Sequence, residues 1–208
     1  GSLVDYVEVH DEPFHRRQFD NEYCWIYIAC FQPGETSLWH RHSQDTLYIC
    51  LQQVAAINRP TDKEPFVHHA AHGDIWWSMS KEQPFVHQVC LLPENPRPSH
   101  FFAMEVLCPP PTGSLSALVH NCYQLRREDS RPGRARVYRL SLQPGESTGT
   151  HVWGFYGVVV SMCDGVITDD GGSELQGQKN PFTDGVLSLH GGWKWVEGPM
   201  TFSVRNAG

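Results

Sequence analysis

The chain has 208 residues, with 16 lysines and arginines against 23 aspartates and glutamates, which gives a formal net charge of −7. It contains no basic run, and an acidic chain repels phosphate backbones, so we expect no nucleic-acid partner. Its purely apolar stretches are only a few residues long, far below the roughly 20 that a membrane helix needs, so we expect a soluble protein with no membrane partner.

The composition favours strands and turns. Glycine (18), proline (15) and the aromatic residues are frequent, whereas charged residues make up only 19%, below the roughly 25% of a typical globular chain. The 7 cysteines form no Cys-x-x-Cys pair, and most lie inside apolar runs. We therefore expect buried thiols in a reducing compartment and a cytoplasmic location.

Short segments rich in valine, isoleucine, tyrosine and tryptophan are the predicted strands. In chain order they are residues 23–31, 46–54, 74–78, 86–92, 101–107, 136–142, 158–161 and 202–205. A proline-rich run at residues 108–113 interrupts the series. The sequence thus predicts an N-terminal domain at residues 1–110, a linker and packing segment at 111–135, and a C-terminal domain at 136–208.

The sequence repeats itself. Residues 31–36 (FQPGET) and 142–147 (LQPGES) match almost letter for letter, and a histidine follows six positions after the glycine in each copy, His40 and His151. Pro-Gly marks a tight turn, because proline presets φ and glycine accepts a positive φ, so strands are expected on both sides. Two copies of one segment predict two units of the same fold.

A His-x-His pair follows the first copy of the turn. Alternate side chains of a strand share a face, so His40 and His42 project the same way and can hold one metal ion together. His87 ends a later glycine-to-histidine segment that begins at Gly73, and it is the predicted third ligand from a neighbouring strand. The competing interpretation is a polar surface strand, which we weigh less because of the glycine spacing and His87.

These residues resemble the cupin superfamily. Gly34, five intervening residues and the histidine pair fit its first motif, and Gly73, Pro84 and His87 fit its second in order and partly in spacing. The resemblance covers residues 31–107 well and 139–206 less well. It implies an all-β chain made of two RmlC-like, cupin-type double-stranded β-helix (jelly-roll) barrels in tandem, with His40, His42 and His87 as metal ligands in the first.

The chain also departs from the cupin pattern. Where many cupins place a glutamate ligand it has Thr46 or Leu47, and strand alternation turns Asp45 outward. We therefore expect a three-histidine site with open positions for one divalent transition metal, which is Fe, Zn, Mn or Ni. By resemblance, such sites are typical of thiol dioxygenases and other O2-using enzymes.

The second repeat is degenerate. His42 becomes Trp153 and His87 becomes Phe202, so only His151 keeps a ligand-type side chain. We expect an apolar, packed C-terminal barrel without metal, acting as a structural or dimer-forming partner. The chain continues only six residues beyond Phe202, and residues 3–30 are the predicted source of its missing strand.

The resulting hypothesis is a mononuclear metal enzyme that acts on a small organic molecule, with oxygenase-type chemistry favoured and a homodimer expected. Tyr48 and Gln44, both inward by strand alternation, are the predicted catalytic residues that orient the substrate. For Glu105 we favour a solvent-facing carboxylate over the alternative, a place in the second coordination shell of the metal. Two alternatives stay open: a non-catalytic cupin that binds a metal and a small molecule, and a purely structural one.

Overall fold

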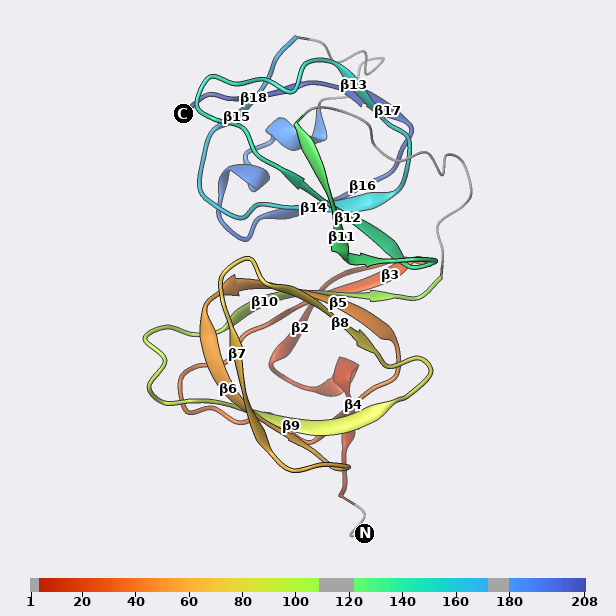
Figure 1. Cartoon of the computed structure of the whole chain (residues 1–208), viewed down its shortest axis with the longest axis vertical. Helices are drawn as coiled ribbons and strands as arrows, with labels where there is room; N and C mark the ends of the chain where they lie inside the picture. The colour runs from red at the N-terminus through yellow and green to blue at the C-terminus, as the bar shows by residue number, and fades with distance from the viewer. Residues whose placement is uncertain (1–3, 109–121, 172–179) are drawn as a thin grey trace. The chain divides into compact units, whose positions relative to one another are not determined.

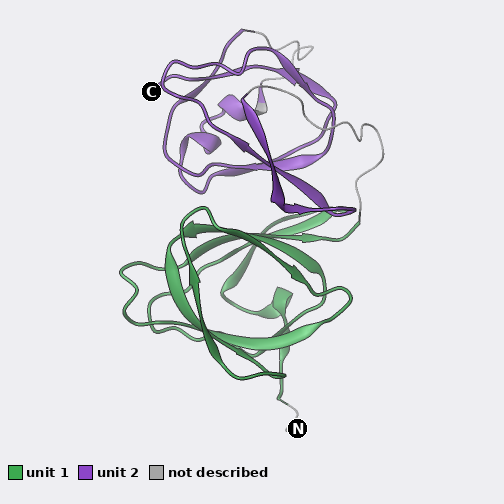
Figure 2. Cartoon of the chain, in the orientation of Figure 1, with its two compact units in different colours: residues 1–109 green, residues 110–208 purple. Residues whose placement is uncertain are grey.

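The computed structural model describes residues 4–108, 122–171 and 180–208. The chain divides into two units, Gly1–Pro109 and Pro110–Gly208, which are coloured separately in Figure 2. None of the helices in the described ranges is long and apolar enough to cross a membrane.

The N-terminal unit is built almost entirely from strands. Its described elements are β1 (Val7–Glu8), the 3-10 helix η1 (Val9–Asp11), β2 (His15–Asp20), β3 (Cys24–Ala29), β4 (His40–His42), β5 (Asp45–Gln52), β6 (Val54–Pro60), β7 (Phe66–Ala70), β8 (Ile75–Met79), β9 (Phe85–Leu91) and β10 (His100–Val106).

These strands form two five-stranded sheets, in the orders β1-β4-β9-β6-β7 and β2-β3-β10-β5-β8. Figure 1 shows the strands surrounding a central space, with η1, in red, lying inside it. Consecutive strands alternate between the two sheets at several points, which is the two-layer arrangement of a jelly roll. The inner faces of both sheets therefore line one interior.

The interior of this unit is aromatic and apolar. Because alternate residues of a strand share a face, Trp25 and Tyr27 of β3 point inward together with Ala103 of β10 and Cys50 of β5, and all four belong to one buried cluster. Its other buried members are Val9, Ala29, Phe31, Val54, Ala56, Ala70 and Leu91. The cluster fixes the spacing of the two sheets around the histidines described below.

The C-terminal unit is also made of strands. Its described elements are β11 (Tyr123–Arg131), β12 (Ala135–Leu140), β13 (His151–Trp153), β14 (Gly157–Val160), β15 (Ile167–Asp169), the 3-10 helices η2 (Pro181–Thr183) and η3 (Val186–Ser188), β16 (Trp193–Val196), β17 (Met200–Phe202) and β18 (Val204–Asn206). Within these residues the strands pair as β11-β12, β13-β17, β14-β16 and β15-β18. The prediction of an all-β chain in two units is confirmed.

The two units repeat the same turn. Gly34 and Gly145 have φ angles of 86° and 80°, a conformation that glycine adopts without strain. The N–H of Gly34 donates to the carbonyl of Leu91 at 2.9 Å, and that of Gly145 donates to the carbonyl of Asn206 at 2.7 Å. The internal repeat seen in the sequence is therefore a structural repeat.

The repeat also preserves strand register. In the N-terminal unit His40 of β4 faces His87 of β9, and in the C-terminal unit His151 of β13 faces Phe202 of β17. The degenerate copy thus keeps the backbone pairing of the first copy while one of the two imidazoles is replaced by a phenyl ring.

Residues 3–30 do not complete the C-terminal barrel, so that expectation is wrong. β3 pairs with β2 on one side and with β10 on the other, both inside the N-terminal unit. Within the described residues, every strand pairing of β1, β2 and β3 is made inside the N-terminal unit, and no sheet joins them to strands of the C-terminal unit.

The predicted linker at residues 111–135 is wrong in its second half. β11 (Tyr123–Arg131) pairs with β12 in an antiparallel hairpin of the C-terminal unit. Alternating valine, tyrosine and leucine side chains in β12 supply the strand-forming partner. The first half of the predicted linker, residues 111–121, lies outside the described residues.

Candidate metal centre

Strand pairing brings histidines from three strands to the interior of the N-terminal unit. His40 and His42 stand on the same face of β4, and β9 lies beside this strand with His87 opposite His40. His15 is the first residue of β2 in the opposite sheet. All four side chains are buried, with at most 8% of their surface exposed.

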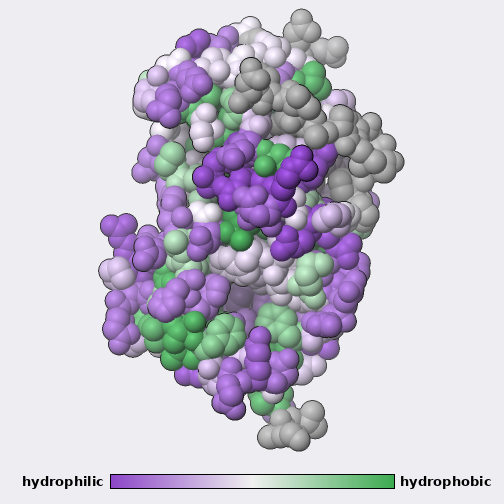
Figure 3. All heavy atoms as spheres, in the orientation of Figure 1, coloured by the Kyte–Doolittle hydropathy of each residue, from purple (hydrophilic) through white to green (hydrophobic). Residues whose placement is uncertain are grey.

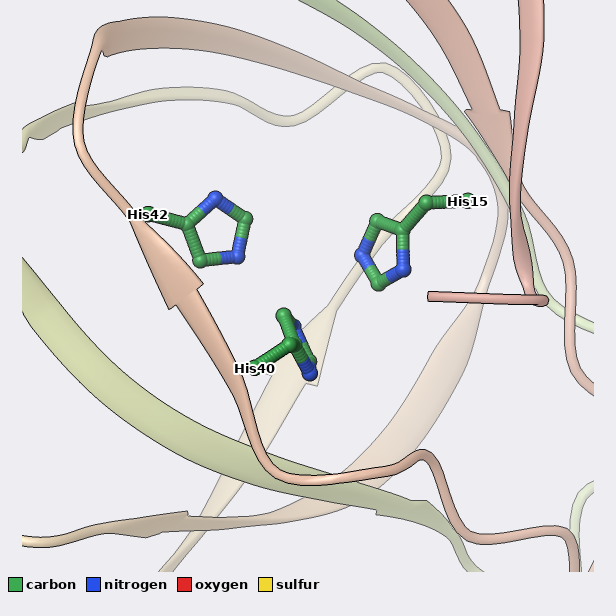
Figure 4. A group of neighbouring side chains, drawn as sticks. All are labelled: His15, His40 and His42. Carbon is green, nitrogen blue, oxygen red and sulfur yellow. The ribbon is translucent and has the colours of Figure 1, made fainter. Parts of the chain in front are cut away.

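The ligand nitrogens of His15, His40 and His42 lie within 4.8 Å of one another. Figure 4 shows the three imidazole rings pointing toward a common centre. Ring centroids are 4.7 Å apart for His15 and His40, 5.0 Å for His40 and His42, and 5.9 Å for His15 and His42. Three imidazoles at this separation match a donor set that divalent transition metals favour.

His87 lies directly beside this cluster. Its ring centroid is 4.5 Å from that of His40 and 5.1 Å from that of His42. The structure therefore gathers all three histidines named from the sequence, and it adds His15. It is His15, however, whose ligand nitrogen converges with those of His40 and His42.

Each of three histidines is held through its Nδ1 atom. The Nδ1 atom of His40 is 2.9 Å from the carbonyl oxygen of Leu38, and that of His87 is 3.0 Å from Oδ1 of Asn58. The Nδ1 atom of His15 is 2.6 Å from Oε2 of Glu12, its shortest contact. An oxygen acceptor at Nδ1 selects the tautomer whose Nε2 atom carries a lone pair, which is how metal-binding histidines are oriented.

The Nε2 atoms of His40 and His87 are buried and have no hydrogen-bond partner. An unpaired buried polar atom costs free energy, and proteins retain few of them. Two such atoms on neighbouring rings, beside a third ring that faces them, fit a shared ion. The residues present thus fit a metal centre.

Burial also keeps these imidazoles neutral. Desolvation, followed by repulsion from His15, lowers the pKa of His40 to about 4. Desolvation and the neighbouring imidazoles hold the pKa values of His42 and His87 well below the usual value. Neutral imidazoles are the form that binds metals, so no proton has to be displaced at neutral pH.

Glu12 fixes the position of His15. Its carboxylate accepts hydrogen bonds from His15, from the N–H of Phe14 at 2.8 Å and from the N–H of Leu38 at 3.2 Å. Burial would raise the pKa of Glu12, but the bond and charge of His15 and the Phe14 N–H together lower it. Leu38 lies two residues before His40. The carboxylate of Glu12 therefore binds both His15 and the segment that leads into His40.

Tyr48 borders the histidine cluster. Its hydroxyl lies 3.4 Å from Nδ1 of His42 and accepts a hydrogen bond from the hydroxyl of Tyr27 at 3.2 Å. Its ring stacks on Trp76, with centroids 5.3 Å apart. Desolvation raises the pKa of Tyr48, so its hydroxyl stays protonated and able to donate.

Gln44 lies in the bend between β4 and β5, where the chain passes from one sheet to the other, and it is partly buried. Its carbonyl oxygen accepts a hydrogen bond from the hydroxyl of Thr46. The bend interrupts the strand alternation from which its direction was inferred.

Asp45 lies on the outward face of β5, as expected, because Tyr48 and Cys50 of the same strand point into the interior. It is nevertheless fully buried, and its Oδ1 atom accepts a hydrogen bond from the N–H of Lys81 at 3.0 Å. The carboxylate thereby stabilises the turn between β8 and β9.

Glu105 does not face solvent, so the expectation of a solvent-facing carboxylate at this position is wrong. It has no exposed surface and shares the inner face of β10 with Ala103. Both faces of β10 are buried, since Phe102 and Met104 are inaccessible as well. The strand sequence alone therefore does not say which of its faces lines the interior.

His15 and Glu12 are the residues that the sequence analysis missed. They lie 25 or more residues before His40 and belong to no motif. Parallel pairing of β1 with β4, with Val7 opposite His40, brings this segment to the cluster. The one local signal that could have indicated them is their spacing: Glu12 stands three positions before His15, which begins a strand.

The C-terminal copy holds no comparable cluster in residues 122–171 and 180–208. There, Nε2 of His151 is 3.0 Å from the hydroxyl of Tyr123, and its Nδ1 is 3.1 Å from the carbonyl of Gly149. Trp153 and Phe202 fill the space around it. Both nitrogens of this histidine already have partners within the chain.

The side of the N-terminal unit that faces the viewer in Figure 3 is hollowed near its middle. In the same orientation, Figure 1 places the ring of strands around this point.

No family model matches the chain, and no curated protein sequence matches it. Solved structures do resemble it. A cupin domain from Bordetella pertussis Tohama I is 20% identical, covers 51% of this chain and 98% of its own length, and has a TM-score of 0.40. An RmlC-like cupin from Methanocaldococcus jannaschii is 17% identical over 44% of this chain and 77% of its own, with a TM-score of 0.35.

A DMSP lyase from Ruegeria pomeroyi DSS-3 is 16% identical, covers 47% of this chain and 42% of its own length, and has a TM-score of 0.33. At these identities and TM-scores the neighbours say nothing about the activity of this chain. The N-terminal unit has the two facing sheets and the histidines paired between β4 and β9 that the resemblance to cupins predicts.

Proposed function

We propose that the N-terminal unit holds one divalent transition metal through His40, His42, His87 and His15, and uses it to act on a small organic molecule. The observation that carries this proposal is the pair of buried, unpartnered Nε2 atoms of His40 and His87, beside the convergent nitrogens of His15 and His42. His15 would take the place of the glutamate that the cupin motif supplies.

The number of imidazole ligands affects which metal ion suits the site. Zinc takes four ligands in closed structural sites, so four histidines would saturate it. Iron, manganese and nickel accept six ligands, which leaves positions for a substrate. A six-coordinate metal therefore favours the enzymatic interpretation, and we propose it over zinc.

When bound, such an ion would supply Lewis-acid polarisation of a substrate oxygen and, if it is iron, redox chemistry with O2. Oxygenase-type chemistry is the reaction class we favour, because the donor set is neutral and leaves the charge of the ion undiminished. The substrate is a small molecule that fits the interior of one barrel.

The residues of the chain would prepare this site. Desolvation keeps the imidazoles of His40, His42 and His87 unprotonated. Phe85 stacks on His42 with centroids 5.1 Å apart and an interplanar angle of 15°, which covers one face of the ring against water. The hydroxyl of Tyr48 receives a hydrogen bond from Tyr27 and keeps its own proton to donate to a bound substrate.

Metal analysis tests the metal-binding part. The full chain without an affinity tag, stripped of metal and titrated separately with Fe(II), Mn(II), Ni(II) and Zn(II), is expected to bind one ion per chain. His40→Ala is expected to abolish stoichiometric binding. The exposed His69 in the same unit supplies the control, and His69→Ala should bind as the unchanged chain does.

A non-catalytic binding role is the second candidate, and the four imidazoles themselves favour it if zinc is the resident ion. Oxygen consumption by the iron-loaded chain with thiols, diketones and phenols separates the two candidates. Consumption that requires both iron and one of these compounds supports the enzyme. Tight zinc binding with no consumption supports the binding protein.

A further inference from the structure

Glu105 is a buried acid in the same interior as the histidines. It stands on β10 opposite Trp25 of β3 and Thr46 of β5. All three side chains are buried, and Glu105 itself has no exposed surface. Its neighbour two residues earlier on the same face, Ala103, belongs to the interior cluster. The carboxyl group therefore points into the barrel.

The two oxygens of Glu105 have different surroundings. Oε2 is 2.9 Å from Nε2 of His10, a half-exposed side chain that stacks on Trp25 with centroids 3.9 Å apart. Oε1 is buried and has no hydrogen-bond partner. Leaving one acceptor of a buried carboxyl group unpaired is costly, so this oxygen can gain from a ligand that donates a hydrogen bond to it.

Two tyrosines are near both Glu105 and the histidine cluster. Tyr27 and Tyr48 are opposite Ala103 on the strands to either side of β10, and the charge of Glu105 contributes to raising the pKa of both. The hydroxyl of Tyr48 in turn lies 3.4 Å from Nδ1 of His42. Glu105 and the histidines thus line one interior.

The charges of this interior are one-sided. Among the described residues, the buried charged side chains are acids and histidines, and none is lysine or arginine. An anionic group on a ligand therefore finds its counter-charge at a metal ion, whereas a cationic group finds it at Glu105. Because Oε2 is bound by His10, Oε1 is the atom left to receive it.

We propose that Oε1 of Glu105 binds a protonated amine on the ligand of the N-terminal unit, while an anionic group of the same ligand binds at the histidine-held metal. The ligand class is thus a small zwitterion that carries an ammonium and a carboxylate. This inference rests on the proposed metal site, since that site anchors the opposite end. Glu105 acts here as a specificity residue that contacts the ligand.

A structural role for Glu105 makes different predictions. If its purpose is to anchor His10 and η1, the Oε2 contact is the important one, and removing the charge weakens the fold. If its purpose is recognition, the unpaired Oε1 atom contributes no stability to the ligand-free chain. In Glu105→Gln the single acceptor oxygen can stay with His10, and the amide then presents an uncharged N–H donor, which does not attract an ammonium, where Oε1 stood.

The test uses the full chain loaded with Ni(II), which is six-coordinate and stable in air. Titration calorimetry compares straight-chain ω-amino acids of three to six carbons with the unsubstituted acids of the same length. At one chain length or more, the amino acid is expected to bind about tenfold more tightly than its partner, as a charge-assisted hydrogen bond implies. In Glu105→Gln this preference disappears, whereas affinities for nickel and for the unsubstituted acids stay unchanged.

Each contrary outcome has one meaning. Equal affinities for amino acids and plain acids, or a preference that survives Glu105→Gln, overturns the role of Glu105 and leaves the metal site intact. Failure of the chain to take up nickel overturns the proposed function and this inference together. A melting temperature of metal-free Glu105→Gln several degrees below that of the unchanged chain assigns Glu105 to anchoring His10, and also overturns the inference.

Discussion

His40 and His87 face each other across β4 and β9, with ring centroids 4.5 Å apart. Their counterparts in the C-terminal unit, His151 and Phe202, face each other in the same register, with ring centroids 4.4 Å apart. The backbone thus builds the same position twice, and the side chains alone decide whether it offers metal ligands. This makes the C-terminal copy a natural reference for substitutions in the first.

His87→Phe copies the C-terminal side chain into the N-terminal unit. We expect metal affinity to fall by at least about tenfold, because one imidazole is lost from the site. The free energy of unfolding of the metal-free chain should change by only about 1–2 kcal/mol, since a large ring still fills the position. Metal titration and denaturant unfolding measure the two quantities.

Phe202→His is the matched control for this substitution. It should create no metal site, because both nitrogens of His151 are already hydrogen-bonded and Trp153 occupies the place of His42. A second bound ion in Phe202→His, or unchanged affinity in His87→Phe, would show that the four-histidine assignment is wrong.

Glu12→Gln tests how His15 is held. An amide has a single acceptor oxygen, so it cannot replace both carboxylate oxygens that bind His15, Phe14 and Leu38. Loss of a carboxylate behind a metal-binding histidine lowers metal affinity by about 10- to 100-fold. Titration with Ni(II) measures the loss, and melting of the metal-free chain records any change in the fold.

Glu105→Gln is the comparison for Glu12→Gln, since it also exchanges a buried carboxyl group for an amide in the same unit but lies behind no proposed ligand. If both variants lose metal affinity equally, the effect is a general one of buried charge. In that case Glu12 has no special part in positioning His15.

The turns of the repeat were predictable from the sequence because their determinants are local. Gly34→Ala should lower the free energy of unfolding by about 1–2 kcal/mol, the usual cost of a left-handed conformation for a residue with a side chain. A Cβ atom there would meet nothing closer than Pro93 at 4.0 Å, so the backbone conformation alone is being tested. Chemical denaturation measures the change.

Gly165 provides the control for this glycine. An added Cβ atom meets nothing within 4 Å, and Gly165 is not among the glycines with positive φ. Gly165→Ala is therefore expected to leave stability unchanged or to raise it by about 0.5 kcal/mol. An equal loss in both variants would mean that the turn at Gly34 does not depend on its left-handed conformation.

The sequence predicts the parts of the site that lie within one strand or one motif, and misses those that arise from pairing between distant segments. His40 and His42 follow from strand alternation, and the position of His87 from the repeat. His15 reaches the cluster only because β1 pairs with β4, a contact that no spacing encodes. The burial of Asp45 was not predictable, because it depends on the turn between β8 and β9, where the N–H of Lys81 donates to its carboxylate.

The metal-free chain should lose stability as the pH falls from 6.5 toward 4.5. Desolvation lowers the pKa of folded His40 from 6.5 to about 4, and shifts His42 and His87 in the same direction. Between these pH values the unfolded chain binds protons that the folded chain excludes, so each such histidine removes about 1.4 kcal/mol of stability per pH unit.

One other group adds to this loss, and two act outside this pH window. Desolvation also lowers the pKa of His68 from 6.5, so its protonation reduces stability in the same direction. Glu12, whose pKa is lowered from 4.5, reduces stability only below that pH. The hydrogen bond to Glu105 raises the pKa of His10 above 6.5, so its contribution is fully present below pH 6.5 and is lost only as the pH rises above it. Urea unfolding at pH 6.5, 5.5 and 4.5 should therefore show a steady decrease of at least about 1.4 kcal/mol per unit. Equal stability at the three pH values would mean that folding does not desolvate these imidazoles, contrary to the burial of the cluster.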